Sequence, residues 1–239
     1  MSVPQAGTPR RRHAGGEVTR LLLLETAERL FATRGVEAVT LREIQLAAGQ
    51  SNSSVIGYHF GSKTGLVRAL ISYRQPALDA ERDAGLAALR QAVDSGARPP
   101  ATARELVELV VRPMVSSIRR GELYIPFLAR LSEDPLARSE YWPSTVEDDL
   151  DGEVAEQIVE SVIGALPPRV RRARTLLFFT SALHTLGDHA RRGLPLSAAR
   201  LSGYVDAWVG MLTAPLSPET ARLLAESRQP AESRQAGDS

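Results

Sequence analysis

The sequence predicts an all-α protein of about nine helices, and two observations support this. Apolar residues recur at intervals of three and four along most of the chain, and no alternating pattern of β-branched residues competes with them. Thr-x-x-Glu boxes and isolated glycines mark where several of these helices begin and end. Since 239 residues suffice for one large domain or two smaller ones, we expect the helices to bury a substantial core.

Two short-range signals define the first helices. The first helix is expected from Thr19, with Gly35 as its stop. The second begins after a capping box made by Thr40 and Glu43 and ends at Gly49. A helix of about eight residues does not persist alone in water, so it has to pack on its neighbours. The inner face of the first helix consists of Leu23, Ala27, Leu30 and Phe31.

The long middle of the chain continues the helical period. Ser62 is an expected N-cap, and Pro76 is expected to kink or interrupt the helix that begins there. The apolar period then continues to Val93, where "SGARPP" breaks it. A second capping box, Thr102 with Glu105, opens the next helix.

The rest of the chain contains further helices and a tail. Pro113 is expected to bend its helix, and a shorter helix is expected over 123–131. An acidic helix is expected over 144–166, and another runs from Pro168 to about Arg192 before the stop at Gly193. Ser197 caps the last helix, and residues 215–239 are expected to be disordered.

Composition restricts the class of protein. Hydrophobic residues make up 43% and charged residues 24%, as in soluble globular proteins. No apolar run reaches the roughly 18 residues of a membrane span, no secretory signal is recognisable, and cysteine is absent, so a cytoplasmic location is expected. Residues 1–70 carry nine Lys/Arg against five Glu, a surplus of +4, while the whole chain has a net charge of +1. This asymmetry fits a module that faces a polyanion, although a solvated face explains it as well.

The stretch "AGQSNSSVIGYHFGSKTGL", residues 48–66, concentrates polar side chains between two apolar helices. Three short helices within some 45 residues have the layout of a helix-turn-helix. The first turn of the last helix would then face the major groove, where amide and hydroxyl groups meet base edges and phosphates. Val55, Ile56 and Phe60 would supply the inward face.

Residues 23–71 resemble the DNA-binding domain of the tetracycline-repressor (TetR) family. The shared features are "A...LF...G" from Ala27 to Gly35, "VTLREI" at 39–44, "AG.S" at 48–51 and "YHFGSK" at 58–63. The sequence departs from the commonest family pattern because 51–60 is one residue longer and because Gln50 and Asn52 replace the usual apolar and basic residues. It resembles a branch with "AGQ.N.SAV.YHFGS".

The resemblance implies roles for individual residues and a domain order. Thr40 would touch a phosphate as well as cap its helix, and His59 could instead be a packed histidine. The expected domains are a disordered basic arm at 1–16, whose arginines could enter a minor groove, a DNA-binding domain at 17–62 and a helical effector-binding and dimerisation domain at 63–214. The expected DNA-binding residues are Thr40, Gln50, Ser51, Asn52, Ser53, Ser54, Tyr58, His59 and Lys63.

The resemblance also implies a homodimer, formed through the last two helices, on a palindromic operator of double-stranded DNA. A small apolar or aromatic effector would bind between the middle helices and release the DNA. Leu176, Phe179, Leu183, Leu186, Leu201, Val205, Trp208 and Leu212 are candidates for the dimer seam, and internal core is the alternative. Candidate pocket residues, for which plain core is again the alternative, are Met114, Tyr124, Phe127, Leu128, Trp142, Phe178 and His184.

Other functions are weighed against this one. The histidines of "HTLGDH" do not converge, because His189 lies roughly 140° around the helix from His184, so no metal site is expected. The sequence contains no activated nucleophile, phosphate-binding glycine loop or converging carboxylate pair, so we expect neither an enzyme nor a cofactor. We therefore predict a sequence-specific transcriptional repressor; the alternative is an activator or an architectural DNA-binding protein without an effector.

Overall fold

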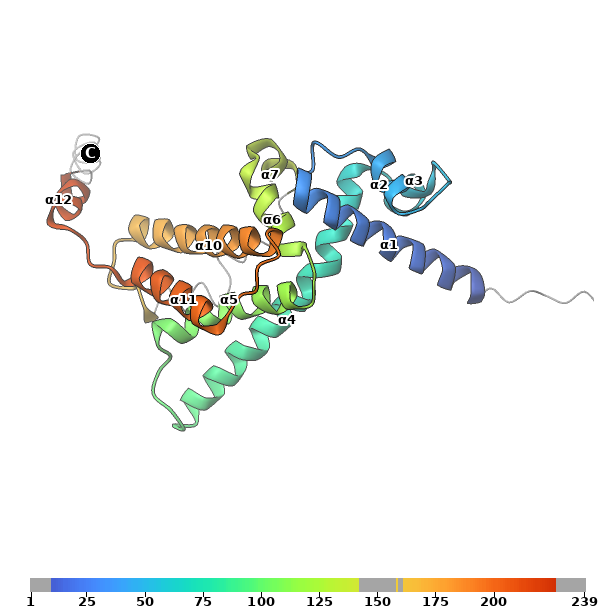
Figure 1. The fold of residues 1–239 in the computed structure, drawn as a ribbon. Coiled ribbons are helices and arrows are strands. Elements are labelled where there is room, and N and C mark those ends of the chain that lie inside the picture. The colour runs from blue at the N-terminus through green and yellow to red at the C-terminus, as the bar shows by residue number, and fades with distance from the viewer. Residues whose placement is uncertain (1–9, 142–157, 159–160, 227–239) are drawn as a thin grey trace, which may run out of the picture.

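The computed structural model describes residues 10–141, 158 and 161–226, and it is all-α across them (Figure 1). The described part contains ten helices and no strand. The N-terminal region consists of α1 (Arg10–Arg34), α2 (Leu41–Ala47) and α3 (Val55–Phe60). The body consists of α4 (Lys63–Asp94), α5 (Ala103–Arg119), α6 (Tyr124–Glu133), α7 (Pro135–Tyr141), α10 (Pro168–Arg191), α11 (Ala198–Thr213) and α12 (Pro218–Glu226). The predicted fold class is confirmed.

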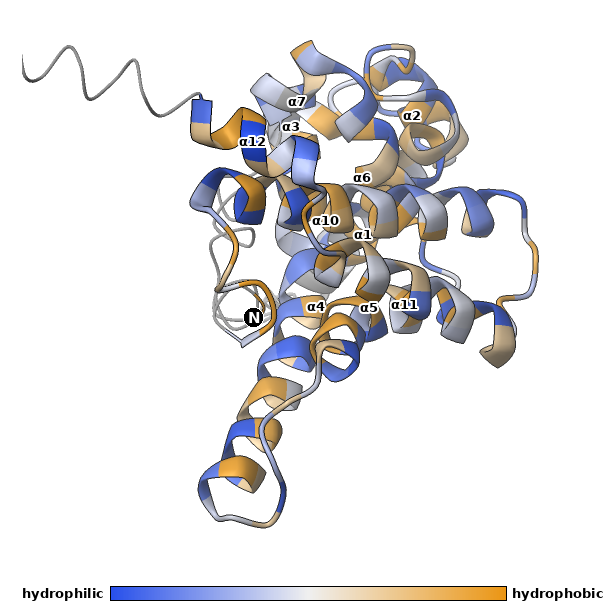
Figure 2. Ribbon diagram, turned by 90° about the vertical axis from the view of Figure 1, so that its left-hand side faces the viewer, coloured by the Kyte–Doolittle hydropathy of each residue, from blue (hydrophilic) through white to orange (hydrophobic). Residues whose placement is uncertain are grey.

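The helices are arranged with the N-terminal region at one end of the molecule. In Figure 1, α2 and α3 lie at the end opposite α12, and the long helix α4 leads from α3 down into the body. Helix α6 packs against both α1 and α10, and α11 packs against α5 and α10. In Figure 2 hydrophobic and hydrophilic residues alternate in bands along α4, as expected for a helix with one buried face.

One hydrophobic core joins the two regions. Phe31 of α1 and Phe127 of α6 are both fully buried, with ring centroids 6.1 Å apart. Tyr124 is also fully buried and packs 6.0 Å from Phe127. Aromatic side chains of this size dominate core energetics, so α1 is held to the body by the same packing that stabilises the body itself.

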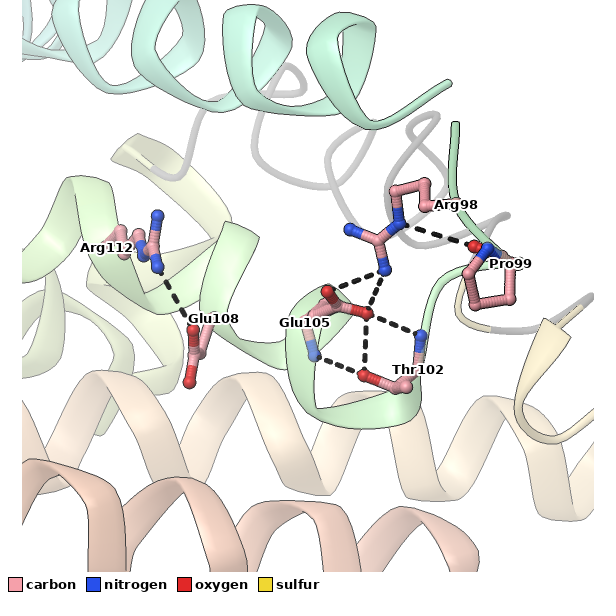
Figure 3. A network of polar contacts seen from close by, with 6 residues as sticks. All are labelled: Arg98, Pro99, Thr102, Glu105, Glu108 and Arg112. Atoms are coloured by element: carbon pink, nitrogen blue, oxygen red, sulfur yellow. Dashed lines mark hydrogen bonds and ion pairs between the residues drawn. The ribbon is translucent and has the colours of Figure 1, made fainter. Parts of the chain in front are cut away.

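Local sequence signals explain most helix ends. Both predicted capping boxes are present, at Thr40 with Glu43 and at Thr102 with Glu105. In the second box, shown in Figure 3, Arg98 also reaches the Glu105 carboxylate at 2.7 Å, which ties the preceding loop to the first turn of α5. At Gly35 the chain turns with φ of 84°, a left-handed conformation that glycine adopts without a Cβ clash.

Three features differ from the sequence-based expectations. Helix α1 begins at Arg10, so part of the segment 1–16 that was expected to be disordered is helical, because the helical pattern that begins near Thr19 propagates toward the N-terminus at little cost. Pro76 lies inside one continuous helix, α4, where buried neighbours such as Leu78 offset the lost hydrogen bond. Helix α12 occupies part of the expected disordered tail, and none of its residues is buried.

Some predictions lie outside the described residues. These include Trp142 and most of the acidic helix expected over 144–166. No helix within 10–141 or 161–226 is long and apolar enough to cross a membrane.

Candidate nucleic-acid interface

The short helix α3 is fixed by its apolar side, which leaves its polar side outward. Val55 and Ile56 are 7% and 3% exposed and pack into the core with the fully buried Ile44 of α2. The turn before α3 and its N-cap are, in contrast, exposed to solvent at Ser51, Asn52, Ser53 and Ser54. Burial of one face therefore determines which side chains of this segment can meet a partner.

A groove of about 880 Å³ lies between α2 and the start of α3. It contains hydroxyl groups from the turn and one guanidinium from α2, so its chemistry suits a polar, anionic partner. The residues that line it are Leu41, Arg42, Gln45, Leu46, Ser51, Ser53, Ser54, Ile56, Gly57 and Tyr58.

Hydrogen bonds within the turn hold it in place and use part of its polar capacity. The Asn52 Oδ1 accepts from the Ser54 amide at 3.0 Å, an Asx turn that leads into α3. The Gln50 side chain is half-buried and donates to the Ala48 carbonyl at 3.2 Å. Gln45 donates to the Gln50 carbonyl at 3.0 Å. Gln50 is thus the most constrained of the five predicted turn residues, and Ser51 to Ser54 are the most available.

Three residues that were predicted to contact the phosphate backbone of DNA come after the turn. Tyr58 is 84% exposed, the most exposed large hydrophobic side chain among the described residues. Its ring stands edge-on to His59 with centroids 4.9 Å apart, and His59 is half-buried. The Lys63 Nζ donates to the Glu37 carbonyl at 3.5 Å and lies 4.0 Å from the Glu37 carboxylate. Tyr58 therefore projects freely, whereas Lys63 is held near an acidic neighbour.

Thr40 is committed to its cap. Its amide and its hydroxyl both donate to Glu43 Oε2, at 2.7 and 2.8 Å, and its hydroxyl oxygen accepts from the Glu43 amide at 3.2 Å. These bonds, with a further one from Arg34, lower the pKa of Glu43 to about 2. A cap alone accounts for the Thr40 hydroxyl; a phosphate could still be met by the amides at the start of α2.

Arg42 and Leu46 are among the groove-lining residues that sequence reasoning missed. Arg42 is exposed on α2, and Leu46, one turn later, is 62% exposed. The signal was available, because the capping box at Thr40 fixes the helix and places positions 42 and 46 on the face opposite the buried Ile44 and Ala48.

Comparison with known proteins points to the same region of the chain. Residues 23–70 match the family model for bacterial regulatory proteins of the tetR family. The matched segment spans the second half of α1, all of α2 and α3 and the start of α4, so the similarity to this family covers the candidate interface. No curated protein matches this chain.

Two solved structures align with this chain over most of its length. A crystal structure of a probable transcriptional regulatory protein, RHA5900, aligns with 22% identity and a TM-score of 0.47, covering 83% of this chain and 100% of that one. A crystal structure of a gamma-butyrolactone receptor (ArpA-like protein) aligns with 20% identity and a TM-score of 0.46, covering 83% and 97%.

The predicted effector-pocket residues fall into two groups. Tyr124, Phe127, Leu128 and Phe178 are buried, and three of them make aromatic contacts with other core residues. The Tyr124 hydroxyl donates to Gln75 Oε1 at 2.8 Å, so this polar group is satisfied inside the core. Met114 is half-buried, and the half-buried His184 has its Nε2 3.0 Å from the Ser132 hydroxyl. These residues therefore lie on three helices of the body, α5, α6 and α10.

Some of the predicted dimer-seam residues belong to the core of one protomer. Val205, Trp208 and Leu212 are each at most 2% exposed, and the Trp208 indole donates to Ser181 at 3.0 Å. Core and interface use the same apolar residue types, which is why the sequence could not separate them. Of the other seam candidates, Leu176 of α10 is 41% exposed; its neighbour Leu177, which was not among the predicted residues, is 57% exposed.

The "HTLGDH" segment lies on α10, and its two histidines have different surroundings. His184 Nδ1 is 3.7 Å from Glu133 and His189 is buried with its Nε2 lacking a hydrogen-bond partner. Within the part of the chain that the structure describes, no three His, Asp or Glu residues form a group that could hold a metal ion.

A buried ionic cluster joins α1 to the body of the molecule. Glu28 of α1 is 3% exposed and accepts from Arg74 Nε of α4 at 2.7 Å and from the Leu123 amide at 2.5 Å. Arg74 also lies 3.4 Å from Glu122. Burial raises the pKa of Glu28 despite the neighbouring guanidinium. Three segments distant in sequence are therefore connected through one carboxylate.

Proposed function

We propose that this chain is a regulator of the TetR family, a homodimeric repressor that binds a palindromic operator and is released from it by a small-molecule effector. The observation that carries the proposal is the outward polar turn before α3, placed over a groove while Val55 and Ile56 anchor the helix. Such a turn offers hydroxyl and amide groups to base edges without unpacking the domain. Acting on chromosomal DNA, the protein would work in the cytoplasm.

The contacts with DNA would divide by position. The turn residues would meet base edges, with Gln50 contributing least because its amide nitrogen is already bonded. Tyr58, His59 and Lys63 would hold the phosphate backbone, and the amides at the start of α2 beside Thr40 would do the same. The base-edge group consists of Gln50, Ser51, Asn52, Ser53 and Ser54.

Dimerisation would place two reading heads, each consisting of α1, α2 and α3 of one copy, about 34 Å apart. This distance is one helical turn of DNA. Leu176 and Leu177 expose apolar surface on α10, and the exposed face of α11 carries the small residues Gly203, Ala207 and Gly210. Small residues let helices approach closely, so these two faces suit a bundle of four helices from two copies. Of the seam candidates that the sequence suggested, this face keeps Leu176 and leaves out the buried Val205, Trp208 and Leu212.

The effector would bind in the body, among the residues predicted for the pocket, and act through α6. Helix α6 packs against α1, so a change in its position is transmitted directly to the reading head. A ligand shifts such an equilibrium only if it binds the two conformations unequally. The aromatic residues of α6 and α10 favour an apolar or aromatic effector.

Footprinting combined with size measurement tests this function. The wild-type chain should protect one short palindromic site near its own gene and elute as a dimer, and a metabolite from a neighbouring pathway should release it. Leu177→Glu should produce monomers and abolish protection, because it places a charge in the proposed interface. Leu136→Glu on α7, where the residue is 80% exposed, is the matched control and should change neither. Diffuse protection, or a wild-type monomer, would contradict the proposal.

A further inference from the structure

Gly57 is the third residue of the six-residue helix α3, and the protein itself gives no reason for a glycine there. A Cβ at this position would meet no heavy atom within 4 Å. Its φ is not in the left-handed region, so the backbone does not require glycine either. A glycine in a helix lowers helix stability relative to alanine, and in so short a helix the cost matters more.

Two other helical glycines, Gly65 and Gly187, have an evident cause within the protein. At Gly65 a Cβ would lie 2.0 Å from the Phe60 carbonyl oxygen, and at Gly187 it would lie 2.8 Å from the Ala129 Cβ. Close packing within the protein explains both. Gly57 has no such neighbour, and the same holds for Gly15, Gly16, Gly203 and Gly210. Of these five glycines, only Gly57 lines the groove between α2 and α3. The space is therefore open toward whatever enters the groove.

We propose that Gly57 and Leu46 form an apolar niche in the reading head that receives the C5-methyl group of a thymine in the major groove. This inference rests on the proposed operator binding and adds a base preference to it. Leu46 is 62% exposed and lines the same groove, so it supplies an apolar wall among hydroxyl groups. The thymine methyl is the apolar group that base pairs present in the major groove. Without a side chain at position 57, the base edge reaches the helix backbone.

The open space at Gly57 also predicts the effect of an alanine at this position. Alanine would stabilise the free helix and at the same time occupy the niche. Stability and DNA affinity therefore change in opposite directions, which a merely structural role of Gly57 would not produce.

The test compares thymine with deoxyuracil, which lacks only the methyl group. A duplex is first selected from random DNA with the full wild-type chain, and each thymine of a half-site is then replaced by deoxyuracil. One position should weaken wild-type binding about fourfold, the effect of losing one buried methyl group. Gly57→Ala should bind the thymine duplex about tenfold more weakly, and at that same position it should gain affinity on deoxyuracil. Its thermal midpoint should equal or exceed that of the wild type.

The outcomes separate the two proposals. If the wild type selects no sequence, the proposed operator binding fails, and the niche fails with it. If the wild type selects a site but tolerates deoxyuracil at every position, only the niche is overturned. Equal or tighter binding by Gly57→Ala on thymine DNA also overturns it. Leu46→Ala provides a second variant, which should lose the thymine preference at the same position without filling the niche.

Discussion

Two capping boxes in this chain have nearly identical chemistry and different surroundings. In the box at Thr40, the threonine amide lies 2.7 Å from the glutamate carboxylate; in the box at Thr102 that distance is 2.9 Å. An arginine approaches each carboxylate, Arg34 at 2.8 Å in the first and Arg98 at 2.7 Å in the second (Figure 3). Hydrogen bonds, chiefly from the threonine amide, lower the pKa of Glu43 and Glu105 to about 2 in both.

The two boxes differ in the helix that each one opens. The first opens a seven-residue helix that leads into the exposed polar turn at 51–54, whereas the second opens the 17-residue helix α5, whose apolar residues enter the core. The cap therefore identifies a helix start in either case and says nothing about function. Function has to be inferred from the polar groups that the neighbouring fold leaves exposed.

The largest expected effect concerns the buried ionic cluster of Glu28, Arg74 and Glu122, which joins α1 to the body of the molecule. Arg74→Ala should lower the free energy of unfolding by about 3–5 kcal/mol, because it leaves the 3% exposed Glu28 carboxylate without its guanidinium. Urea denaturation measures this. Arg120→Ala, which removes a 45% exposed partner of Glu122, is the control and should cost less than about 1 kcal/mol. Equal losses in the two variants would show that the buried cluster does not hold the regions together.

The next prediction separates contacts with DNA bases from contacts with the phosphate backbone. Asn52→Ala should weaken binding to the operator by about 1–3 kcal/mol and affect random DNA much less, because a lost base contact is sequence-specific. Lys63→Ala should weaken binding to both DNAs and reduce the salt slope by about 1, because a phosphate contact is not. Titrations at two salt concentrations measure both variants. Equal losses on operator and random DNA for Asn52→Ala would remove it from the base-reading group.

The comparison of the two boxes is tested directly by matched substitutions. Thr40→Ala and Thr102→Ala should each cost about 1 kcal/mol of stability, because each removes the same cap. Only Thr40→Ala should also reduce DNA affinity, since the start of α2 faces the proposed phosphate contact. Calorimetry and DNA titration on the same samples provide the two readouts. If Thr102→Ala lost DNA affinity to the same degree, the effect would arise from stability alone.

The smallest expected effect is the response to acid. The pKa values of Glu43 and Glu105 are lowered to about 2, so their contributions to stability are complete above the ordinary value of 4.5 and are lost as the pH falls toward 2. Glu28 has the opposite sign, because its raised pKa makes its contribution greatest at low pH. Unfolding between pH 5 and about pH 2 should therefore show a shallower loss for Glu105→Gln than for wild type. An unchanged slope would indicate that the box does not persist in solution.

Local signals predicted local structure well. Both capping boxes, the N-caps at Ser62 and Ser197 and the stop at Gly35 were readable because each involves residues within a few positions of one another. The outward polar turn before α3 was readable for the same reason. Its use as a DNA contact is a prediction that the geometry supports and experiment has to decide.

Long-range features were not readable. Burial of Trp208 depends on which helix lies opposite it, and a periodic apolar stripe is the same for a core and for an interface. The pairing of Glu28 with Arg74 joins residues 46 positions apart, and neither has a sequence signature. Pro76 was expected to kink or interrupt its helix, and α4 continues through it. Tertiary packing, which stabilises α4 across the proline, cannot be seen in the local sequence.

Site-specific photo-crosslinking tests the central claim most directly. A photoreactive phenylalanine analogue at position 58, where Tyr58 is 84% exposed at the groove, should crosslink to a selected duplex. The same analogue in place of Leu223, which is 51% exposed on α12 at the other end of the molecule, should not. Crosslinks at position 58 alone are the result that the account predicts. A DNA complex that crosslinks at position 223 and not at 58 would contradict it.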